Sequence, residues 1–234
     1  MLHLLLSMAL ANPDLHNLET DYPEQYERRW NLSPYPNRIG QLHFVGSDLI
    51  SPDWIPLYLE RYHQKGESTD VRRALLYLMH RCDPNLHPSI LRSYESESVE
   101  LRATIVELTL PNRFDASLFN LSSRDSSESV QRELLLAISS NPDLPIKPIR
   151  NALQSKDVDV LQAAIRAIHW REAVELIPDL IEQLNHPSTF IQLKALYALS
   201  KLDRAEAKRQ VKRRRFDQST DHHVSHLAKG LMQD

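Results

Sequence analysis

The chain has 234 residues, of which 41% are hydrophobic and 25% are charged, and its formal net charge at pH 7 is −3. These values are typical of a soluble globular chain, and the length suffices for one substantial hydrophobic core. The four glycines lack the close spacing that a Rossmann or P-loop nucleotide site needs, and the single cysteine, Cys82, excludes an intramolecular disulfide.

The chain begins with a short apolar run, MLHLLLSMALA at residues 1–11, which ends in the small-x-small pattern Ala-Leu-Ala. This pattern precedes the cleavage site of secretory signal peptides. We therefore expect a bacterial signal peptide at residues 1–11 and a periplasmic or secreted mature protein. Because the run contains no Lys or Arg, an apolar segment packed on the rest of the chain is the alternative. No other apolar run approaches the roughly 20 residues of a membrane span, so we expect none.

Residues 12–50 are rich in proline and aromatic side chains, among them Tyr26, Trp30 and Tyr35. A short helix is expected at about residues 23–30, with Asp21 as its N-cap. Aromatic side chains are most simply explained by burial. We therefore interpret residues 12–50 as a capping segment for the repeats that follow, with binding of a partner as the alternative.

A repeat of about 30 residues fills residues 51–234. Its apolar anchor positions are spaced by 30, 29, 30, 31 and 33 residues and are Val71, Leu101, Val130, Val160, Ile191 and Val224. Four and eight residues after each anchor the chain is again apolar, except at Thr109. Apolar residues at this period form one stripe on a helix. The pattern predicts six helices, one at each anchor.

Residues three before the anchors are all Ser or Asp: Ser68, Ser98, Ser127, Asp157, Ser188 and Asp221. The side-chain oxygens of such residues accept hydrogen bonds from the unpaired N–H groups of a first helical turn. This column of predicted N-caps fixes the register of the repeat.

A second, more variable helix is expected in each repeat. The candidate ranges are 52–62, 88–94, 114–121, 145–154, 173–184 and 204–216. Pro56, Pro88, Pro148 and Pro178 stand in or near the first turn of four of them, where proline is tolerated. Two short helices per repeat must bury their stripes against neighbours.

The segments 159–168, 173–184 and 188–199 carry a resemblance to the HEAT-repeat superfamily in its short-repeat form. This resemblance implies an all-α, right-handed α-solenoid of about six helical hairpins with an irregular N-terminal cap. Solenoids of this family serve mainly as binding surfaces. We therefore expect a non-enzymatic scaffold for protein–protein interaction, with a protein partner, no cofactor and no metal.

In the family the second helix of each pair lines a concave groove. Polar residues one, two or nine positions after the anchors are therefore candidates for binding a protein. They are Arg72, Arg73, His80, Arg102, Gln131, Arg132, Gln162, His169 and Gln192. Arg and Gln side chains suit carboxylates, phosphates or peptide backbone. An ordinary solvated helix face is the alternative.

Residues 204–215, RAEAKRQVKRRR, carry seven positive charges and one negative charge. The basic patch within them comprises Lys208, Arg209, Lys212, Arg213, Arg214 and Arg215. A patch of this density could neutralise phosphates, but it lacks interleaved aromatic residues and a reading-helix motif. Nucleic acid is therefore the disfavoured partner. The alternative function is a nucleic-acid-binding solenoid, similar to alkylpurine DNA glycosylases, that uses the arginine positions and this helix.

Three further features bear on catalysis or metal binding. His222 and His226 have the i, i+4 spacing of metal ligands, with Asp221 beside them, but no second ligand pair supports a site. His80 is two residues from Cys82, and such residues point to different sides of a helix. The His-Glu pairs of the similar deoxyhypusine hydroxylases are absent, and neither a bilin lyase pocket nor a glycosylase acid can be identified. We assign no catalytic residue.

Overall fold

The computed structural model describes residues 51–85 and 87–233, and every regular element in these residues is helical. The all-α prediction is thereby confirmed for this part of the chain, where no helix has both the length and the apolar character needed to cross a membrane. The predicted signal peptide and capping segment, residues 1–50, lie outside the described residues. The chain divides into two compact units, Met1–Ile90 and Leu91–Asp234, which are taken separately below.

The described part of the first unit contains one helical pair. The 3₁₀ helix η3 (Pro52–Trp54) leads into α4 (Ile55–His63), which packs against α5 (Thr69–Cys82). Tyr58 and Tyr62 of α4 are buried in this pair. The next helix, α6 (Pro88–Ser93), contains the boundary between the units.

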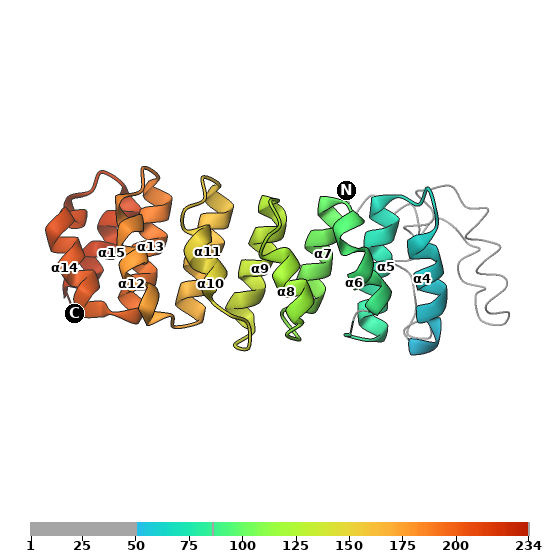
Figure 1. Cartoon of the computed structure of the whole chain (residues 1–234). Helices are drawn as coiled ribbons and strands as arrows, with labels where there is room; N and C mark the ends of the chain where they lie inside the picture. Colours follow the sequence, from blue (N-terminus) through green and yellow to red (C-terminus); the bar gives the residue numbers. More distant parts are fainter. Residues whose placement is uncertain (1–50, 86, 234) are drawn as a thin grey trace, which may run out of the picture. The chain divides into compact units, whose positions relative to one another are not determined.

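The second unit is a succession of helices in which a longer helix that contains an anchor alternates with a shorter one. In chain order they are η4 (Tyr94–Ser96), α7 (Val99–Thr109), α8 (Ala116–Ser122), α9 (Glu128–Ser140), α10 (Lys147–Ala152), α11 (Val158–Trp170), η5 (Val174–Leu176), α12 (Ile177–Glu182), η6 (Gln183–Asn185), α13 (Thr189–Leu202), α14 (Arg204–Arg214), η7 (Phe216–Gln218) and α15 (His222–Gln233). The anchor helix α7 packs on α9, α9 on α11, α11 on α13 and α13 on α15 (Figure 1). The shorter helices α8, α10, α12 and α14 each pack on the anchor helix that follows.

The anchors form the centre of the core. All six anchor side chains are completely buried, and so are most residues four and eight positions later. Thr109, the polar exception in the sequence pattern, is buried as well, and its hydroxyl finds no partner. Met232 lies at the same offset in α15 and is 37% exposed. The predicted register is therefore confirmed, with one position open to solvent.

The predicted N-cap column is confirmed in position, and four of its six members make the expected bond. The side-chain oxygens of Ser68, Ser98, Asp157 and Asp221 accept from the anchor N–H at 2.8 to 3.4 Å. Ser127 and Ser188 are N-cap residues whose side chains make no capping bond. Their own N–H groups donate instead to side chains two residues earlier, Asp125 and His186.

Side chains also join one repeat to the next through backbone carbonyls. Arg171, at the end of α11, donates to the carbonyls of Ile138, Asn141 and Leu144 through Nη1 and to Pro142 through Nη2, at 2.7 to 3.2 Å. Asn141 in turn donates to the carbonyl of Leu110 at 2.7 Å, and Gln183 to that of Leu153 at 3.1 Å. Carbonyls at helix ends have no partner within their helix. The side chains of Arg171, Asn141 and Gln183 supply these carbonyls with hydrogen-bond donors from the neighbouring repeat.

The buried stripe of α11 generates a first prediction. Replacing Ala164, which is fully buried, by aspartate places an unpaired carboxylate in the core. The cost is several kcal/mol, on the order of the total stability, so Ala164→Asp is expected to unfold the second unit. The matched control is Arg166→Asp on the same helix, because Arg166 is exposed. Helical circular dichroism and thermal melting measure the result. Wild-type melting of Ala164→Asp would contradict the register.

A second prediction concerns the hydrogen bonds from Arg171 to the carbonyls of Ile138, Asn141, Pro142 and Leu144, which we call the Arg171 clamp. Removing the guanidinium in Arg171→Ala leaves the carbonyls of residues 138–144 without their shared donor, and some of these groups are half-buried or buried. We expect a loss of about 2–4 kcal/mol in the free energy of unfolding. Arg166→Ala, which removes an exposed arginine from the same helix, should change it by less than about 0.5 kcal/mol. If urea denaturation gives the same free energy of unfolding for Arg171→Ala and Arg166→Ala, the clamp adds no stability.

Candidate functional site

Four of the expected groove residues donate to backbone that precedes their own helices. Each stands one position after an anchor and donates to a backbone carbonyl: Arg72 to Tyr62 at 2.9 Å, Arg102 to Glu97 at 2.8 Å, Gln131 to Asp125 at 3.0 Å and Gln192 to His186 at 2.7 Å. Ser225, at the same offset in α15, donates to the carbonyl of Asp217 at 3.0 Å. These side chains are thus engaged within the fold, so we leave the four groove candidates out of the proposed binding surface.

Arg102 also takes part in a buried ionic cluster that the sequence analysis missed. Its guanidinium contacts the carboxylate of Asp125 at 2.6 and 3.1 Å, and the Tyr94 hydroxyl donates to the same carboxylate at 3.3 Å. Burial acts to raise the pKa of Asp125, but hydrogen bonds from Arg102 and the Ser127 N–H outweigh it and hold the pKa below its usual value. Burial and the neighbouring Asp125 charge raise the pKa of Tyr94. The cluster therefore stabilises the ionised carboxylate.

The other expected groove residues are Arg73, His80, Arg132, Gln162 and His169. Arg73 pairs with Asp70 at 3.2 Å, and Arg132 pairs with Glu133 at 3.0 Å; both arginines are exposed. The three remaining side chains are half-buried. Among the described residues of the second unit, no hydrogen bond, ion pair or ring contact joins Arg132, Gln162 and His169 to one another.

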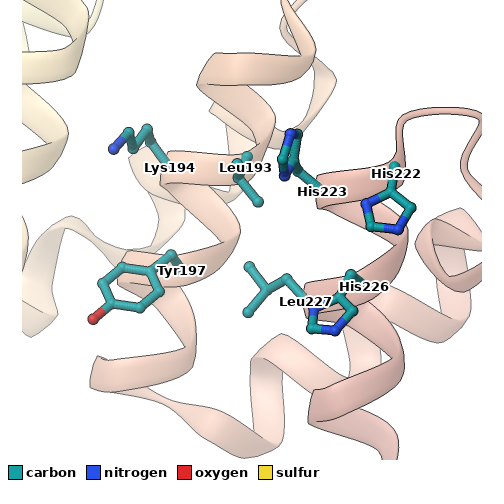
Figure 2. Close-up of a pocket in the computed structure, with 7 residues that line it drawn as sticks. All are labelled: Leu193, Lys194, Tyr197, His222, His223, His226 and Leu227. Atoms are coloured by element: carbon teal, nitrogen blue, oxygen red, sulfur yellow. The ribbon is translucent and has the colours of Figure 1, made fainter.

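A pocket of about 440 Å³ lies between α13 and α15 (Figure 2). Seven residues line it: Leu193, Lys194, Tyr197, His222, His223, His226 and Leu227. Leu193 and Leu227 point toward the space between the two helices and are half-buried. We call this feature the α13–α15 pocket. Leu193 and Leu227 form the apolar base of the pocket. The other lining groups are the ammonium of Lys194, the phenol of Tyr197 and three imidazoles.

The three histidines of the pocket lie close together. The ring centroid of His222 is 5.8 Å from that of His223 and 6.0 Å from that of His226, and all three side chains are exposed. The rings of His222 and His226 are nearly parallel, at 21°. Asp221, the carboxylate next to them in the chain, accepts from the N–H groups of His223 and Val224.

Exposed aromatic side chains extend the pocket onto α11. Tyr197 lies 5.7 Å from the ring of His169, which lies 5.3 Å from the ring of Trp170. Phe190 lies beside the pocket residue Lys194, whose ammonium is 5.2 Å from the ring. Trp170 is 62% exposed, Tyr197 45% and Phe190 42%. We define the candidate binding surface as the α13–α15 pocket together with His169, Trp170 and Phe190.

The basic patch is confined to α14 and the residue after it. Arg209 pairs with Glu206, and the Arg214 side chain, which donates to Asn185 at 3.3 Å, is half-buried. Burial and the charge of Arg213 lower the pKa of Arg214. Lys212, Arg213 and Arg215 are exposed, while Lys208 is half-buried. In the described part of the chain none of these last four forms an ion pair within 4 Å, although the charge of Arg213 contributes to lowering the pKa of Glu206.

Two other features of the sequence are the C-terminal histidines and Cys82. In residues 51–85 and 87–233 no three His, Cys, Asp or Glu side chains lie together as a group that could hold a metal ion. Burial raises the pKa of the half-buried Cys82 thiol. A raised pKa disfavours the nucleophilic thiolate.

Comparisons with protein-family models and with curated proteins give no match for this chain.

The Arg102–Asp125 pair generates a third prediction. Arg102→Ala leaves a largely buried carboxylate, with 6% of its side chain exposed, without its cation. We expect the free energy of unfolding at pH 7 to fall by about 3 kcal/mol. Because the folded pKa of Asp125 lies below the unfolded value of about 3.9, this stabilisation is complete above that value and is lost as the pH falls through the folded pKa.

The control is Arg132→Ala, which breaks a pair between adjacent residues whose arginine is 44% exposed. It should cost less than about 1 kcal/mol. Urea denaturation at pH 7, and again at a pH below the folded pKa of Asp125, gives the free energy of unfolding of wild type and of both variants. A difference between wild type and Arg102→Ala that does not shrink in acid would contradict the assignment.

Proposed function

We propose that the chain is a right-handed HEAT-like α-solenoid of about six helical pairs that acts as a non-enzymatic scaffold for protein–protein interaction. Support for the architecture comes from the anchors, the caps and the bonds between successive repeats. The HEAT resemblance rests on these same positions. We also propose, from residues 1–11, that the protein acts in the periplasm or outside the cell.

The observation that carries the functional proposal is the candidate binding surface on α11, α13 and α15. Exposed aromatic side chains gathered beside a pocket with an apolar base are the feature that protein-recognition sites share, because such side chains supply contact area at low entropic cost. Trp170, Tyr197 and Phe190 are each more than two fifths exposed. Trp170 is linked through His169 to the pocket residue Tyr197, and Phe190 separately contacts the pocket residue Lys194.

The second candidate function, binding of nucleic acid, rests on α14. Lys212, Arg213 and Arg215 are exposed and form no ion pair within 4 Å in the described part of the chain. A helix with this density of cations attracts any polyanion. The aromatic side chains lie elsewhere, on α11 and α13, so α14 lacks the stacking groups of a single-strand platform. We therefore place this function second.

A site-specific crosslinking experiment tests the proposal and constitutes a fourth prediction. A photoreactive phenylalanine analogue replaces Tyr197 in the full chain, and in a matched variant it replaces Phe114, an aromatic residue of similar exposure before α8. We expect irradiation of cells to join a protein of defined mass to position 197 and not to position 114. The partner, once identified and purified, should bind the Trp170→Ala variant at least about tenfold more weakly than wild type.

Two results would contradict the proposal. One is the same adduct pattern at positions 197 and 114, which would indicate random encounter. The other is a partner whose affinity is unchanged by Trp170→Ala, which would move the interface away from the proposed surface.

A further inference from the structure

The α13–α15 pocket has an unusual charge composition. The sequences of α13 and α15 contain no aspartate or glutamate, whereas they contain Lys194, Lys201, Lys229 and the three histidines. Of these side chains, Lys194 and the histidines line the pocket. Exposed helix faces normally mix charges of both signs, so a face without carboxylates calls for an explanation.

The charged groups of the elements packed against α15 do not reverse this balance. They are Lys194 and Lys201 on α13, Asp217 on η7, and the basic residues with Glu206 on α14. Asp221 precedes α15, accepts from its first N–H groups and lies near enough to His223 for the charge of that histidine to contribute to lowering the pKa of Asp221, while Glu206 pairs with Arg209. The described residues that line the pocket include no carboxylate.

We propose that the α13–α15 pocket binds an acidic peptide segment of a partner protein, with an apolar side chain against Leu193 and Leu227 and carboxylates against Lys194 and the three histidines. The inference rests on the proposed function and specifies the chemistry of the partner. A volume of about 440 Å³ falls in the range of sites that bind small ligands or a few side chains.

The observations favour a peptide over a nucleic-acid strand. A strand needs a continuous track of cations along its backbone, and the pocket holds a single lysine. The apolar base formed by Leu193 and Leu227 has no counterpart on a phosphate backbone, whereas it fits an aliphatic side chain. Carboxylates accept charge-assisted hydrogen bonds from ammonium and imidazolium groups.

The histidines make binding dependent on pH. Imidazole side chains gain a positive charge within about pH 8 to 5, while glutamate of a peptide remains ionised down to about pH 4.3. Positive charges on rings about 6 Å apart repel each other, and a bound carboxylate offsets that repulsion. Binding of the peptide and uptake of protons therefore favour each other.

The test uses the full chain and synthetic peptides with blocked ends. Three peptides carry four glutamates around a central Leu, Phe or Val, and three counterparts carry glutamine in place of glutamate. Calorimetry at low ionic strength measures affinity at pH 7.5 and 5.5, and a comparison of two buffers at pH 6.5 measures proton uptake. We expect at least one glutamate peptide to bind roughly tenfold more tightly at pH 5.5, with net proton uptake.

Three variants locate the effect. Lys194→Gln should weaken binding at both pH values by at least about threefold. The triple variant His222→Gln, His223→Gln, His226→Gln should remove both the dependence on pH and the proton uptake. Lys229→Gln changes an exposed lysine on α15 outside the pocket lining and should bind within about twofold of wild type. Because all these side chains are exposed or half-buried, the variants should keep the wild-type melting temperature.

Several outcomes would overturn the proposal. One is that no glutamate peptide binds at pH 5.5. Another is that the glutamine peptides bind as tightly as the glutamate peptides. A third is that Lys194→Gln and Lys229→Gln lose the same amount of affinity for the glutamate peptide. Displacement of the glutamate peptide from the pocket by a 12-base-pair DNA duplex, with loss of duplex binding in Lys194→Gln, would assign the pocket to nucleic acid instead. If crosslinks at position 197 persist while the peptides fail, only the chemistry of the partner is wrong and the scaffold function stands.

Discussion

The structure depends on the burial of one apolar anchor per repeat beneath a capped helix start. Helices as short as α8, α10 and α12 are not stable alone in water, so each exists only because it packs on the following anchor helix. Because every anchor is fully buried, a small shift of register would place polar neighbours in the core. The residue after the anchor adds a second restraint, since in several repeats it holds the preceding turn through a carbonyl.

The same arrangement explains how much of the fold could be predicted. Anchors and caps are local patterns, and a buried Val160 beneath Asp157 can be read from adjacent residues. The Arg171 clamp cannot, because its carbonyl acceptors lie 27 to 33 residues earlier and belong to backbone of any sequence. The Arg102–Asp125 pair spans 23 residues and depends on how two turns approach each other. Such contacts leave no periodic signal.

The candidate site was predictable only in part. His222 and His226 drew attention through their spacing, but the sequence does not say that Leu193 and Tyr197 face them across two helices. Conversely, Arg102 and Gln192 occupy offsets that suggest an exposed groove, and their side chains instead turn back onto the backbone. The offset along a helix predicts a face, while the nearest unpaired carbonyl decides where a long polar side chain lies. His169 was selected from its offset, and its contact with Tyr197 links it to the pocket.

The Arg171 clamp joins successive repeats through groups whose charge does not change with pH. Its donor is a guanidinium, which stays charged at every physiological pH, and its acceptors are backbone carbonyls, which do not titrate. The hydrogen bonds that the side-chain amides of Asn141 and Gln183 donate to neighbouring repeats likewise contain no group that titrates. The histidines of the α13–α15 pocket take no part in these hydrogen bonds between repeats. The donors and acceptors of these bonds therefore keep their charge when the pH changes.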